Sequence, residues 1–467
     1  MKIKLFKACV FCLMLIIISN WLYGVLSWKE DSCGLHDLYE LEDNSVDVLF
    51  FGNSHCYCSI SEGILWDKYG ITSCLVTESG QNWSTTYYYM KEALKHQKPK
   101  VLVVETSYVH GYGTQLSNIY RNTINLKYSK EYFDNLKVLM DLNLVVENEK
   151  EKIENAIKWK VPVIHTRYKE LTKEDFVKKD YRGSFVTRWN CDSYETPEAC
   201  YDKAVGKIEE DKLLYLDKMI RLAKENGCQI IFFTAPYILN KEQQETYNAL
   251  NDYCIENAIQ YINMNKNYKN IKFDYATDMM GENGAGSHVN YYGAEKITCF
   301  LGELLRDEYN IANHKDDNDK QLWIDMAEIQ RHLVSENQLK SESSVEEYLN
   351  CLKGMENCII AIQGIGEQKI DRKLLEGLGL IVNEELNAIL IDSGNIIYSS
   401  NEEAYQYQMD LDTEGFIMQG NPEGKSIIYN NQIKNKVSEG ICIFVYDKIL
   451  KKEIDTIGFN NIEEGVR

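Results

Sequence analysis

The sequence predicts an α/β protein: a parallel β-sheet covered by helices, followed by a smaller strand-rich domain and preceded by a single transmembrane helix. Three observations predict it. The chain has 467 residues, whereas one hydrophobic core seldom organises more than about 250 to 300, so we expect two folded domains. From Val46 onward, short β-branched runs alternate with helical patterns, which is typical of a parallel sheet. An apolar run also follows the first lysines.

The N-terminal segment predicts the compartment. Lys2, Lys4 and Lys7 precede an apolar run over about residues 8–26, close to the roughly 20 residues that cross a bilayer. Positive charge stays on the cytoplasmic side, and the run has no small-x-small cleavage signature. We interpret residues 1–30 as a signal anchor that leaves the bulk of the chain extracytoplasmic. A cleaved signal peptide and a buried core helix are the alternatives.

The first domain, over residues 45–310, is predicted from alternating elements. Its expected strands are Val46 to Phe51, Ser73 to Thr77, Lys100 to Thr106, Gln229 to Thr234 and Ile271 to Tyr275. Its expected helices carry apolar residues at three- and four-residue spacing: Thr85 to His96, Asp211 to Asn226 and Gln243 to Tyr261. Gly227 occupies the position of a helix C-terminal cap, so the turn into the Gln229 strand is well marked.

The rest of the chain departs from this alternation. Residues 110–205 form an insertion that is too long for a simple crossover and that we expect to shape the substrate cleft. Residues 311–345 are charged and are interpreted as a linker that contains one helix around residues 323–333. Residues 346–467 change to short β-like runs, which predicts a compact α+β domain rich in strands: Cys358 to Ile362, Ala388 to Ile391, Ser426 to Tyr429 and Ile441 to Tyr446.

Charge and cysteine usage exclude several classes of function. The formal net charge of −20 offers no basic stripe for a phosphate backbone, so nucleic-acid binding is not expected. Of the 14 cysteines, only Cys9 and Cys12 have C-x-x-C spacing, and both lie in the apolar N-terminal run, so we expect no metal site, and nothing in the sequence calls for a cofactor. In an exported domain, Cys191 and Cys200 could form a disulfide, and free thiols are equally compatible with the sequence.

Ser54 and His288 are the candidate catalytic residues. Ser54 follows an apolar strand that ends in Gly52-Asn53, and ligands in open α/β sheets bind beyond the carboxyl ends of the strands. A serine hydroxyl needs a base to become a good nucleophile. His288 lies on a loop just before a helix that Asn290 can cap, where it could take the proton from Ser54. Without that pairing, Ser54 would be interpreted as a helix cap and His288 as a structural loop histidine. His55 and His110 are interpreted as solvated loop histidines.

Three stretches of the sequence together resemble the SGNH (GDSL-like) hydrolase superfamily, in its membrane-anchored bacterial branch of acyltransferases and esterases. The resemblance covers about residues 45–310 and rests on three stretches: Phe51-Gly52-Asn53-Ser54-His55, Ser79-Gly80-Gln81-Asn82, and His288-Val289-Asn290-Tyr291-Tyr292-Gly293-Ala294. It implies a flavodoxin-like, three-layer sheet and a serine that attacks an acyl carbonyl. It also implies an oxyanion hole built from the backbone amides of Ser54 and Gly80.

The chain departs from that family pattern at two places. The asparagine expected after the third strand has no match, because that strand ends in Glu105-Thr106-Ser107, and Asn82 could take its place in the oxyanion hole. The family usually places an aspartate three residues before the histidine, where this chain has Ala285. An orienting acid is defined by geometry, so Glu282, Asp278 and Asp274 are all candidates. A Ser–His dyad and an inactive relic are further alternatives.

The C-terminal domain resembles the interleukin-like inducer (ILEI) domain, over about residues 350–462. The resemblance rests on Lys425 to Gln432, on Glu439-Gly440-Ile441-Cys442-Ile443-Phe444-Val445-Tyr446-Asp447, and on Ile454 to Asn460. It implies a β-rich module that accompanies carbohydrate-active or glycan-binding parts. The arginine-glycine pair usual in that family is Glu439-Gly440 here.

The sequence therefore predicts serine acyl-ester chemistry on a cell-surface polysaccharide, at the outer face of a membrane. Transfer of the acyl group and its hydrolysis are equally compatible with the residues. Transfer would need a donor, for which a membrane-bound O-acyltransferase partner is one source. The competing hypothesis is a non-catalytic glycan-binding or assembly protein on a degenerate SGNH fold.

Overall fold

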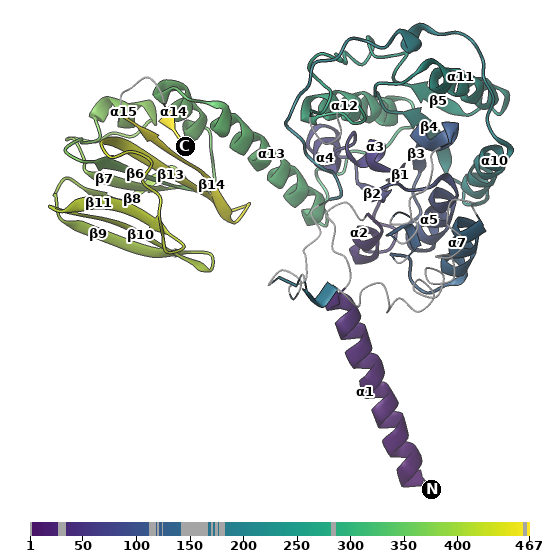
Figure 1. The fold of residues 1–467 in the computed structure, drawn as a ribbon, viewed down its shortest axis with the longest axis horizontal. Helices are drawn as coiled ribbons and strands as arrows, with labels where there is room; N and C mark the ends of the chain where they lie inside the picture. Colours follow the sequence, from purple (N-terminus) through teal and green to yellow (C-terminus); the bar gives the residue numbers. More distant parts are fainter. Residues whose placement is uncertain are drawn as a thin grey trace. The chain divides into compact units, whose positions relative to one another are not determined.

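The computed structural model describes residues 2–26, 34–111, 118, 121–123, 125–141, 167–169, 171–172, 176, 183–281, 286–460 and 465–467. The chain divides into two compact units, Met1–Ala327 and Glu328–Arg467. Nearly half of the predicted insertion over residues 110–205 lies outside the described residues, as does Glu282. Both units are drawn in Figure 1.

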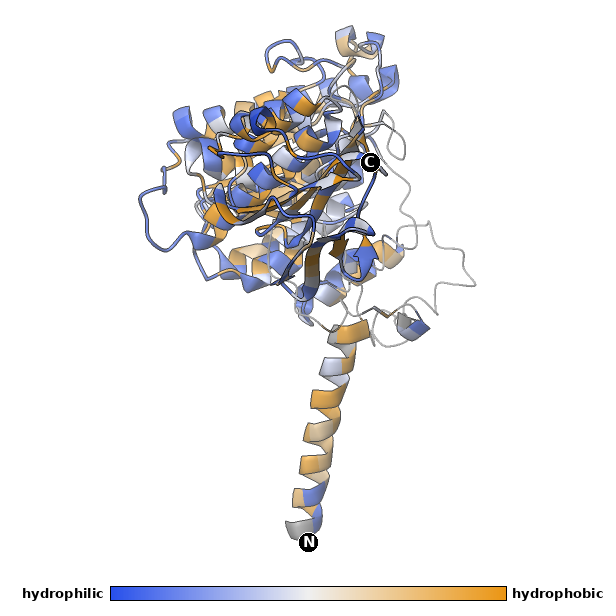
Figure 2. Ribbon diagram, turned by 90° about the vertical axis from the view of Figure 1, so that its left-hand side faces the viewer, coloured by the Kyte–Doolittle hydropathy of each residue, from blue (hydrophilic) through white to orange (hydrophobic). Residues whose placement is uncertain are grey.

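The first helix, α1 (Lys2–Leu26), covers the predicted anchor segment. Its large apolar side chains are exposed, including Ile16, Ile17 and Ile18, and the hydropathy colouring in Figure 2 shows apolar residues along most of the helix. Within the part of the chain whose structure is described, no helix meets the combined length and apolarity of a membrane span.

The first unit is built on a five-stranded, fully parallel sheet with strand order β2-β1-β3-β4-β5. This is the flavodoxin-like order, and it confirms the predicted parallel sheet. The strands are β1 (Val48–Gly52), β2 (Ser73–Thr77), β3 (Val101–Glu105), β4 (Gln229–Thr234) and β5 (Gln260–Asn263). The central strands β1 and β3 are buried along their whole length, as expected for a sheet covered on both faces.

The helices of this unit alternate with the strands (Figure 1). They are α2 (Gly34–Glu40), α3 (Ser54–Tyr57), α4 (Glu62–Tyr69), α5 (Trp83–His96), α7 (Lys130–Asp141), α10 (Glu210–Glu225), α11 (Lys241–Glu256) and α12 (Tyr291–Asp307), with short 3₁₀ turns at Ser107–His110, Arg167–Lys169 and Glu198–Tyr201. Gly227 has a φ of +72° directly after α10 and Asn226, as predicted for a helix C-terminal cap.

One predicted strand is wrong. Residues 271–275 form no strand, because Lys272 adopts a φ of +56°, which interrupts an extended conformation. The fifth strand is β5, and its first two residues fall in the segment predicted to continue the helix to Tyr261. Helix α11 ends at Glu256, and Ala258 turns the chain with a φ of +55°.

The strand order sets the position of the site. From β1 the chain goes to β2 on one side of the sheet, and β3 lies on the other side of β1. The carboxyl ends of β1 and β3 therefore form the topological switch point, where open α/β sheets bind ligands. Ser54 follows β1 there, and Glu105 is the last residue of β3.

The second unit packs two antiparallel sheets against each other. The six-stranded sheet has the order β15-β14-β13-β6-β7-β8 and the four-stranded sheet has the order β12-β11-β10-β9. One face of the larger sheet packs on the smaller sheet through Phe416, Met418 and Phe444, and its other face is covered by Tyr348 and Leu349 of α14 and Leu375 of α15. The elements are α14 (Val345–Lys353), β6 (Cys358–Ile365), α15 (Arg372–Gly377), β7 (Ala388–Asp392), β8 (Asn395–Ser400), β9 (Tyr405–Leu411), β10 (Glu414–Asn421), β11 (Gly424–Tyr429), β12 (Gln432–Ile433), β13 (Gly440–Asp447), β14 (Lys452–Phe459) and β15 (Gly465–Val466).

The segment interpreted as a linker over residues 311–345 is mostly ordered. Ile311 and Trp323 are buried in the core of the first unit, and the Trp323 indole donates to the Ser73 carbonyl oxygen at 3.0 Å. The helix around residues 323–333 is longer than predicted: α13 extends over Gln321–Ser341, and its Leu339 is buried in the core of the second unit.

Candidate active site

A tight turn presents Ser54 at the carboxyl end of β1. Gly52 has a φ of +152°, and a Cβ atom there would lie 2.8 Å from the Glu105 Cβ and 2.9 Å from the Cys56 Cβ. Only glycine fits both the conformation and the space. The Asn53 side chain accepts a hydrogen bond from the His55 amide at 2.8 Å and caps α3, which begins at Ser54.

His288 lies 234 residues after Ser54 in the sequence but contacts it in the fold. Its Nε2 lies 2.7 Å from the Ser54 Oγ, within hydrogen-bond distance. The His288 loop is held by main-chain hydrogen bonds, from the Met280 amide to the His288 carbonyl oxygen and from the Asn290 amide to the Asp278 carbonyl oxygen, both at 2.9 Å. Asn290 also caps α12 through the Gly293 amide. The structure therefore brings together the two residues that the sequence proposes as nucleophile and base.

The surroundings keep His288 neutral. Burial, and then the positive charge of Arg188, lower the pKa of His288 from 6.5 to about 4. The imidazole is therefore uncharged near neutral pH. With its proton on Nδ1, it leaves Nε2 free to accept the Ser54 hydroxyl proton, which is the protonation state that a general base needs.

The two described acids that were proposed to orient His288 are bonded to other groups. The His288 Nδ1 is buried and has no hydrogen-bond partner among the described residues. Asp278 is buried and pairs with Lys296 at 2.6 Å. The Asp274 Oδ1 accepts the main-chain amide two residues further on, at 2.9 Å. Glu282 lies outside the described residues. The described part of the site is therefore a Ser–His pair.

Two of the three residues proposed for the oxyanion hole, Gly80 and Asn82, follow β2, the strand beside β1, whereas the third, Ser54, begins α3. Gly80 has a φ of +59°, and a Cβ atom there would lie 2.2 Å from the Asn118 Nδ2, so this turn requires glycine. The Asn82 Oδ1 accepts the Ser84 amide and caps α5. The structure thus gives both residues a local structural role, and their part in an oxyanion hole stays a prediction.

A buried network supports the Ser54 turn from the end of β3. The Glu105 carboxylate accepts hydrogen bonds from the Ser107 amide at 3.0 Å and from its hydroxyl at 2.8 Å, and from the Ala235 amide at 3.3 Å. The Asn53 Nδ2 donates to the Ser107 Oγ at 2.9 Å. Full burial raises the pKa of Glu105 to about 7 even though these hydrogen bonds favour its charged form.

Glu105→Gln is expected to change how stability depends on pH. The Glu105 pKa is about 7 in the folded chain and 4.5 without the fold, so wild type loses stability as pH rises from about 4.5 through 7. The difference in unfolding free energy between variant and wild type should move in favour of the variant by about 3 kcal/mol from pH 4 to pH 8. Urea denaturation at both pH values measures it. Ser54→Ala keeps Glu105 and should follow wild type, whereas parallel curves for Glu105→Gln and wild type would contradict the assignment.

His55 is a correction to the sequence analysis. It is 8 % exposed instead of solvated, and its ring lies 5.0 Å from the His288 ring and 5.1 Å from the Tyr237 ring, centroid to centroid. Burial, and then His288 and His110, hold the pKa of His55 well below 6.5. His110 is half-buried and packs edge-on against Tyr247. A neutral, packed His55 therefore lies beside the His288 ring.

A segment near the end of the predicted insertion lies beside the Ser54–His288 pair. We call residues 184–194 the strap. The Val186 amide donates to the carbonyl oxygen of Tyr57, the last residue of α3, at 3.0 Å, and the Tyr291 amide donates to the Arg188 carbonyl oxygen at 2.7 Å. Sequence reasoning missed Arg188, because it is a single basic residue with no motif around it and lies 100 positions before His288.

The cysteines considered for a disulfide are both free. The Cys191 thiol donates to the Thr277 carbonyl oxygen at 3.2 Å, and the Cys200 sulfur lies 3.6 Å from the Tyr275 hydroxyl. The two sulfurs thus contact the same segment, at Thr277 and at Tyr275, and are not bonded to each other.

One cluster in the second unit has metal-ligand chemistry: His332, Cys358 and Asp447. The His332 Nδ1 lies 2.6 Å from the Asp447 Oδ2, a hydrogen-bond distance, and the Cys358 thiol donates to the same oxygen at 3.8 Å. The Asp447 Oδ1 accepts two main-chain amides at 2.8 Å each. These hydrogen bonds account for the buried carboxylate, and the cluster carries no metal assignment.

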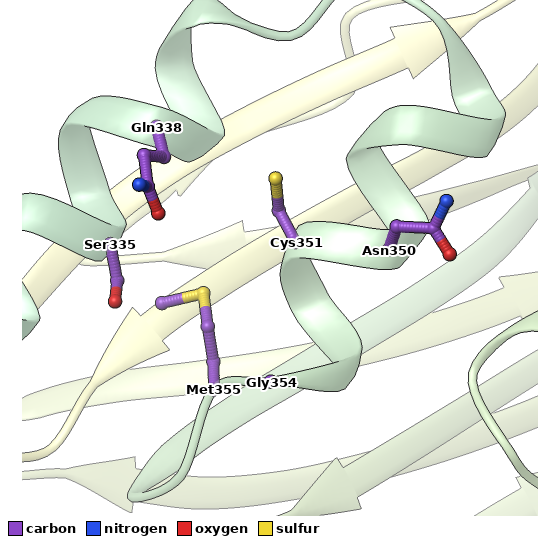
Figure 3. A pocket seen from close by; sticks show the side chains of 6 residues that line it. All are labelled: Ser335, Gln338, Asn350, Cys351, Gly354 and Met355. Atoms are coloured by element: carbon purple, nitrogen blue, oxygen red, sulfur yellow. The ribbon is translucent and has the colours of Figure 1, made fainter.

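The second unit also has a hollow that contains none of the candidate catalytic or metal-ligating residues. It lies along α13 and α14, and Figure 3 shows the side chains that line it: Ser335, Gln338, Asn350, Cys351, Gly354 and Met355. These lining residues include no histidine and no carboxylate, so the hollow offers no base or acid for catalysis.

Comparison with protein-family models and with curated proteins gives no match. Among solved structures, the chain is similar to a crystal structure from Bacteroides fragilis described as a "putative acylhydrolase". The identity is 13 %, the similarity covers 60 % of this chain and 99 % of that chain, and the TM-score is 0.30. A similarity at this level carries no argument about the chemistry of Ser54 and His288.

Proposed function

We propose that this protein performs serine acyl-ester chemistry, with Ser54 as nucleophile and His288 as general base and then general acid. The observation that supports this most directly is the 2.7 Å separation between the Ser54 Oγ and the His288 Nε2 at the switch point of a parallel sheet. The lowered pKa of His288 adds to it, because the base is already neutral at physiological pH. The resemblance of both segments to SGNH hydrolases points to the same chemistry.

The reaction would proceed in two steps. The Ser54 Oγ bonds to the acyl carbon as its proton passes to the His288 Nε2, and His288 then protonates the alcohol as the ester bond breaks. In the second step the hydroxyl of water or of a sugar attacks the acyl-serine. His288 takes the proton of that hydroxyl and returns a proton to Ser54. Water completes a hydrolysis, and a sugar hydroxyl completes an acyl transfer.

The setting we propose is a cell-surface polysaccharide outside a membrane. The exposed apolar side chains of α1 support membrane attachment, since lipid would remove them from water. The three lysines before the apolar run support an extracytoplasmic position for the rest of the chain. If the reaction is a transfer, a membrane-bound O-acyltransferase is a suitable source of the acyl group. The ILEI-like domain would add contacts to the glycan.

Ser54→Ala tests the covalent step. The full-length protein and the variant are incubated with 4-nitrophenyl acetate, quenched in acid and digested, and the peptide that contains residue 54 is analysed by mass spectrometry. We expect an acetyl adduct on residue 54 in wild type and in Ser59→Ala, and none in Ser54→Ala. The Ser59→Ala variant is a matched control, because Ser59 is buried in the same segment and its hydroxyl is bonded to the His55 carbonyl oxygen. An absence of any Ser54-dependent adduct would reject the mechanism.

One observation favours a second candidate function, a non-catalytic glycan-binding or assembly role. Among the described residues, no acceptor orients the His288 Nδ1, and Asp278 is engaged with Lys296. Under this alternative, Ser54→Ala and His288→Ala would leave surface-glycan acylation in cells unchanged, while deletion of residues 346–467 would reduce glycan binding. Loss of acylation in both point variants would eliminate it.

A further inference from the structure

The strap is attached to both catalytic segments through its main chain. Toward Ser54, the Ser184 amide donates to the Glu62 carboxylate at 2.9 Å, and the Val186 amide donates to the end of α3. Toward His288, the Asn190 carbonyl oxygen accepts the Gly281 amide at 3.1 Å, beside the accepting Arg188 carbonyl oxygen. Arg188 lies in the middle of the strap, so its backbone is fixed between the nucleophile and the base.

The Arg188 side chain carries a charge that no described carboxylate neutralises. It is exposed, and its only hydrogen bond within the described residues goes to the Thr187 carbonyl oxygen at 3.2 Å. Burial is the main cause of the lowered pKa of His288 and of the raised pKa of Cys58, and the Arg188 charge acts on both groups in the lowering direction. The guanidinium therefore lies near the base and near the end of α3.

We propose that Arg188 binds an anionic group, a carboxylate or a phosphate, on the substrate beside its ester, so that the site selects O-acylated anionic glycans over neutral ones. This inference rests on the proposed acyl-ester function and names its substrate class. A guanidinium presents paired N–H donors that match the two oxygens of a carboxylate or a phosphate, and such charge-assisted bonds are among the strongest in proteins.

The neighbours of Arg188 suit a sugar ring that carries the anion. Trp189 packs against Tyr291 with ring centroids 4.6 Å apart, and Tyr292 lies edge-on to Trp189 at 6.3 Å with 46 % of its surface exposed. Aromatic rings combine an apolar body with a polar edge, which complements the C–H face and the hydroxyls of a sugar. The arginine and the aromatic rings thus offer adjacent contacts for charge and for ring.

Binding is measured without turnover by using the Ser54→Ala variant, which lacks the proposed nucleophile and retains Arg188. The probes are acetylated glucose, acetylated glucuronate and acetylated glucose 6-phosphate, with dissociation constants from NMR titration of the full-length chain. We expect one or both anionic probes to bind more tightly than the neutral one. Adding Arg188→Gln should reduce that preference by about ten- to one-hundredfold. Arg188→Lys should retain part of it, and Arg221→Gln, on the exposed face of α10, should retain all of it.

The outcomes separate this inference from the proposed function. A preference for glucuronate that depends on Arg188 identifies a carboxylate as the ligand, and one for the phosphate probe identifies a phosphate. Equal binding of all three probes, or a preference that survives Arg188→Gln, overturns the inference. Acetate release by wild type from the same probes is scored independently: if none depends on Ser54, the acyl-ester function fails, whatever the binding shows.

Discussion

Replacing His288 by glutamine is expected to lower kcat/KM for an acetyl ester by about 10²- to 10⁴-fold, the contribution usual for a general base. Glutamine can keep a hydrogen bond to the Ser54 Oγ but cannot take its proton. The rate is measured as acetate release by the full-length chain, against Ser54→Ala as the background. His110→Gln is the matched control, because His110 is half-buried in the same unit and contacts Gln243 and Tyr247 instead of Ser54.

The pH profile of wild type should carry the signature of the same residue. The base acts only when it is unprotonated, and the His288 pKa is lowered to about 4, so kcat/KM should stay high down to about pH 5 and fall to half near pH 4. After burial, the positive charge of Arg188 is the second cause of the lowered His288 pKa. Arg188→Gln removes that charge, so it should raise the His288 pKa and move the acid limb of the profile to higher pH. An acid limb near 6.5 in wild type would contradict the electrostatic description of the site.

Gly52→Ala is expected to destabilise the first unit by about 2 to 5 kcal/mol, the sum of backbone strain and overpacking. The new Cβ would lie 2.8 Å from the Glu105 Cβ and 2.9 Å from the Cys56 Cβ, in the middle of the network behind Ser54. Relief would require β1 to move away from β3, which would also displace the nucleophile. The free energy of unfolding is measured by urea denaturation, together with the rate of ester turnover.

Gly227→Ala separates the cost of backbone strain from the cost of overpacking. Gly227 also has a positive φ, of +72°, but a Cβ atom there would meet no atom within 4 Å. It should therefore lose only about 1 kcal/mol through its conformation, with turnover unchanged. If the two variants lost the same stability, close packing around Gly52 would not be the cause.

Most of the parallel sheet could be predicted from the sequence, because its strands are short, buried apolar runs. Strands β2 and β4 occupy the predicted residues, and β1 and β3 differ from the prediction only at their ends. The fifth strand could not be predicted, since the signal that ends α11 is Ala258 in a left-handed conformation. Alanine rarely adopts that conformation, so nothing in the residue type marks the turn.

The candidate site was predictable where local motifs carry it. Ser54 follows a strand with a Gly-Asn turn, and His288 precedes a capped helix, so each could be recognised from its neighbours. The burial of His55 and the position of Arg188 depend on contacts between residues far apart in sequence, which a single sequence does not reveal. Asp278 illustrates the same difficulty, since its pairing with Lys296 on α12 becomes visible only in the fold.

The strap is bonded to the Ser54 segment and to the His288 segment through main-chain atoms, so its amino-acid sequence can change in evolution. Hydrogen bonds from the Val186 amide and to the Arg188 carbonyl oxygen are available to almost any residue type at those positions. The side chains of the strap can therefore be exchanged while Ser54 and His288 keep their spacing. If the proposed function holds, the main chain of the strap maintains the spacing of Ser54 and His288 while its side chains determine which substrate binds, so substrate preference can change without moving the two residues.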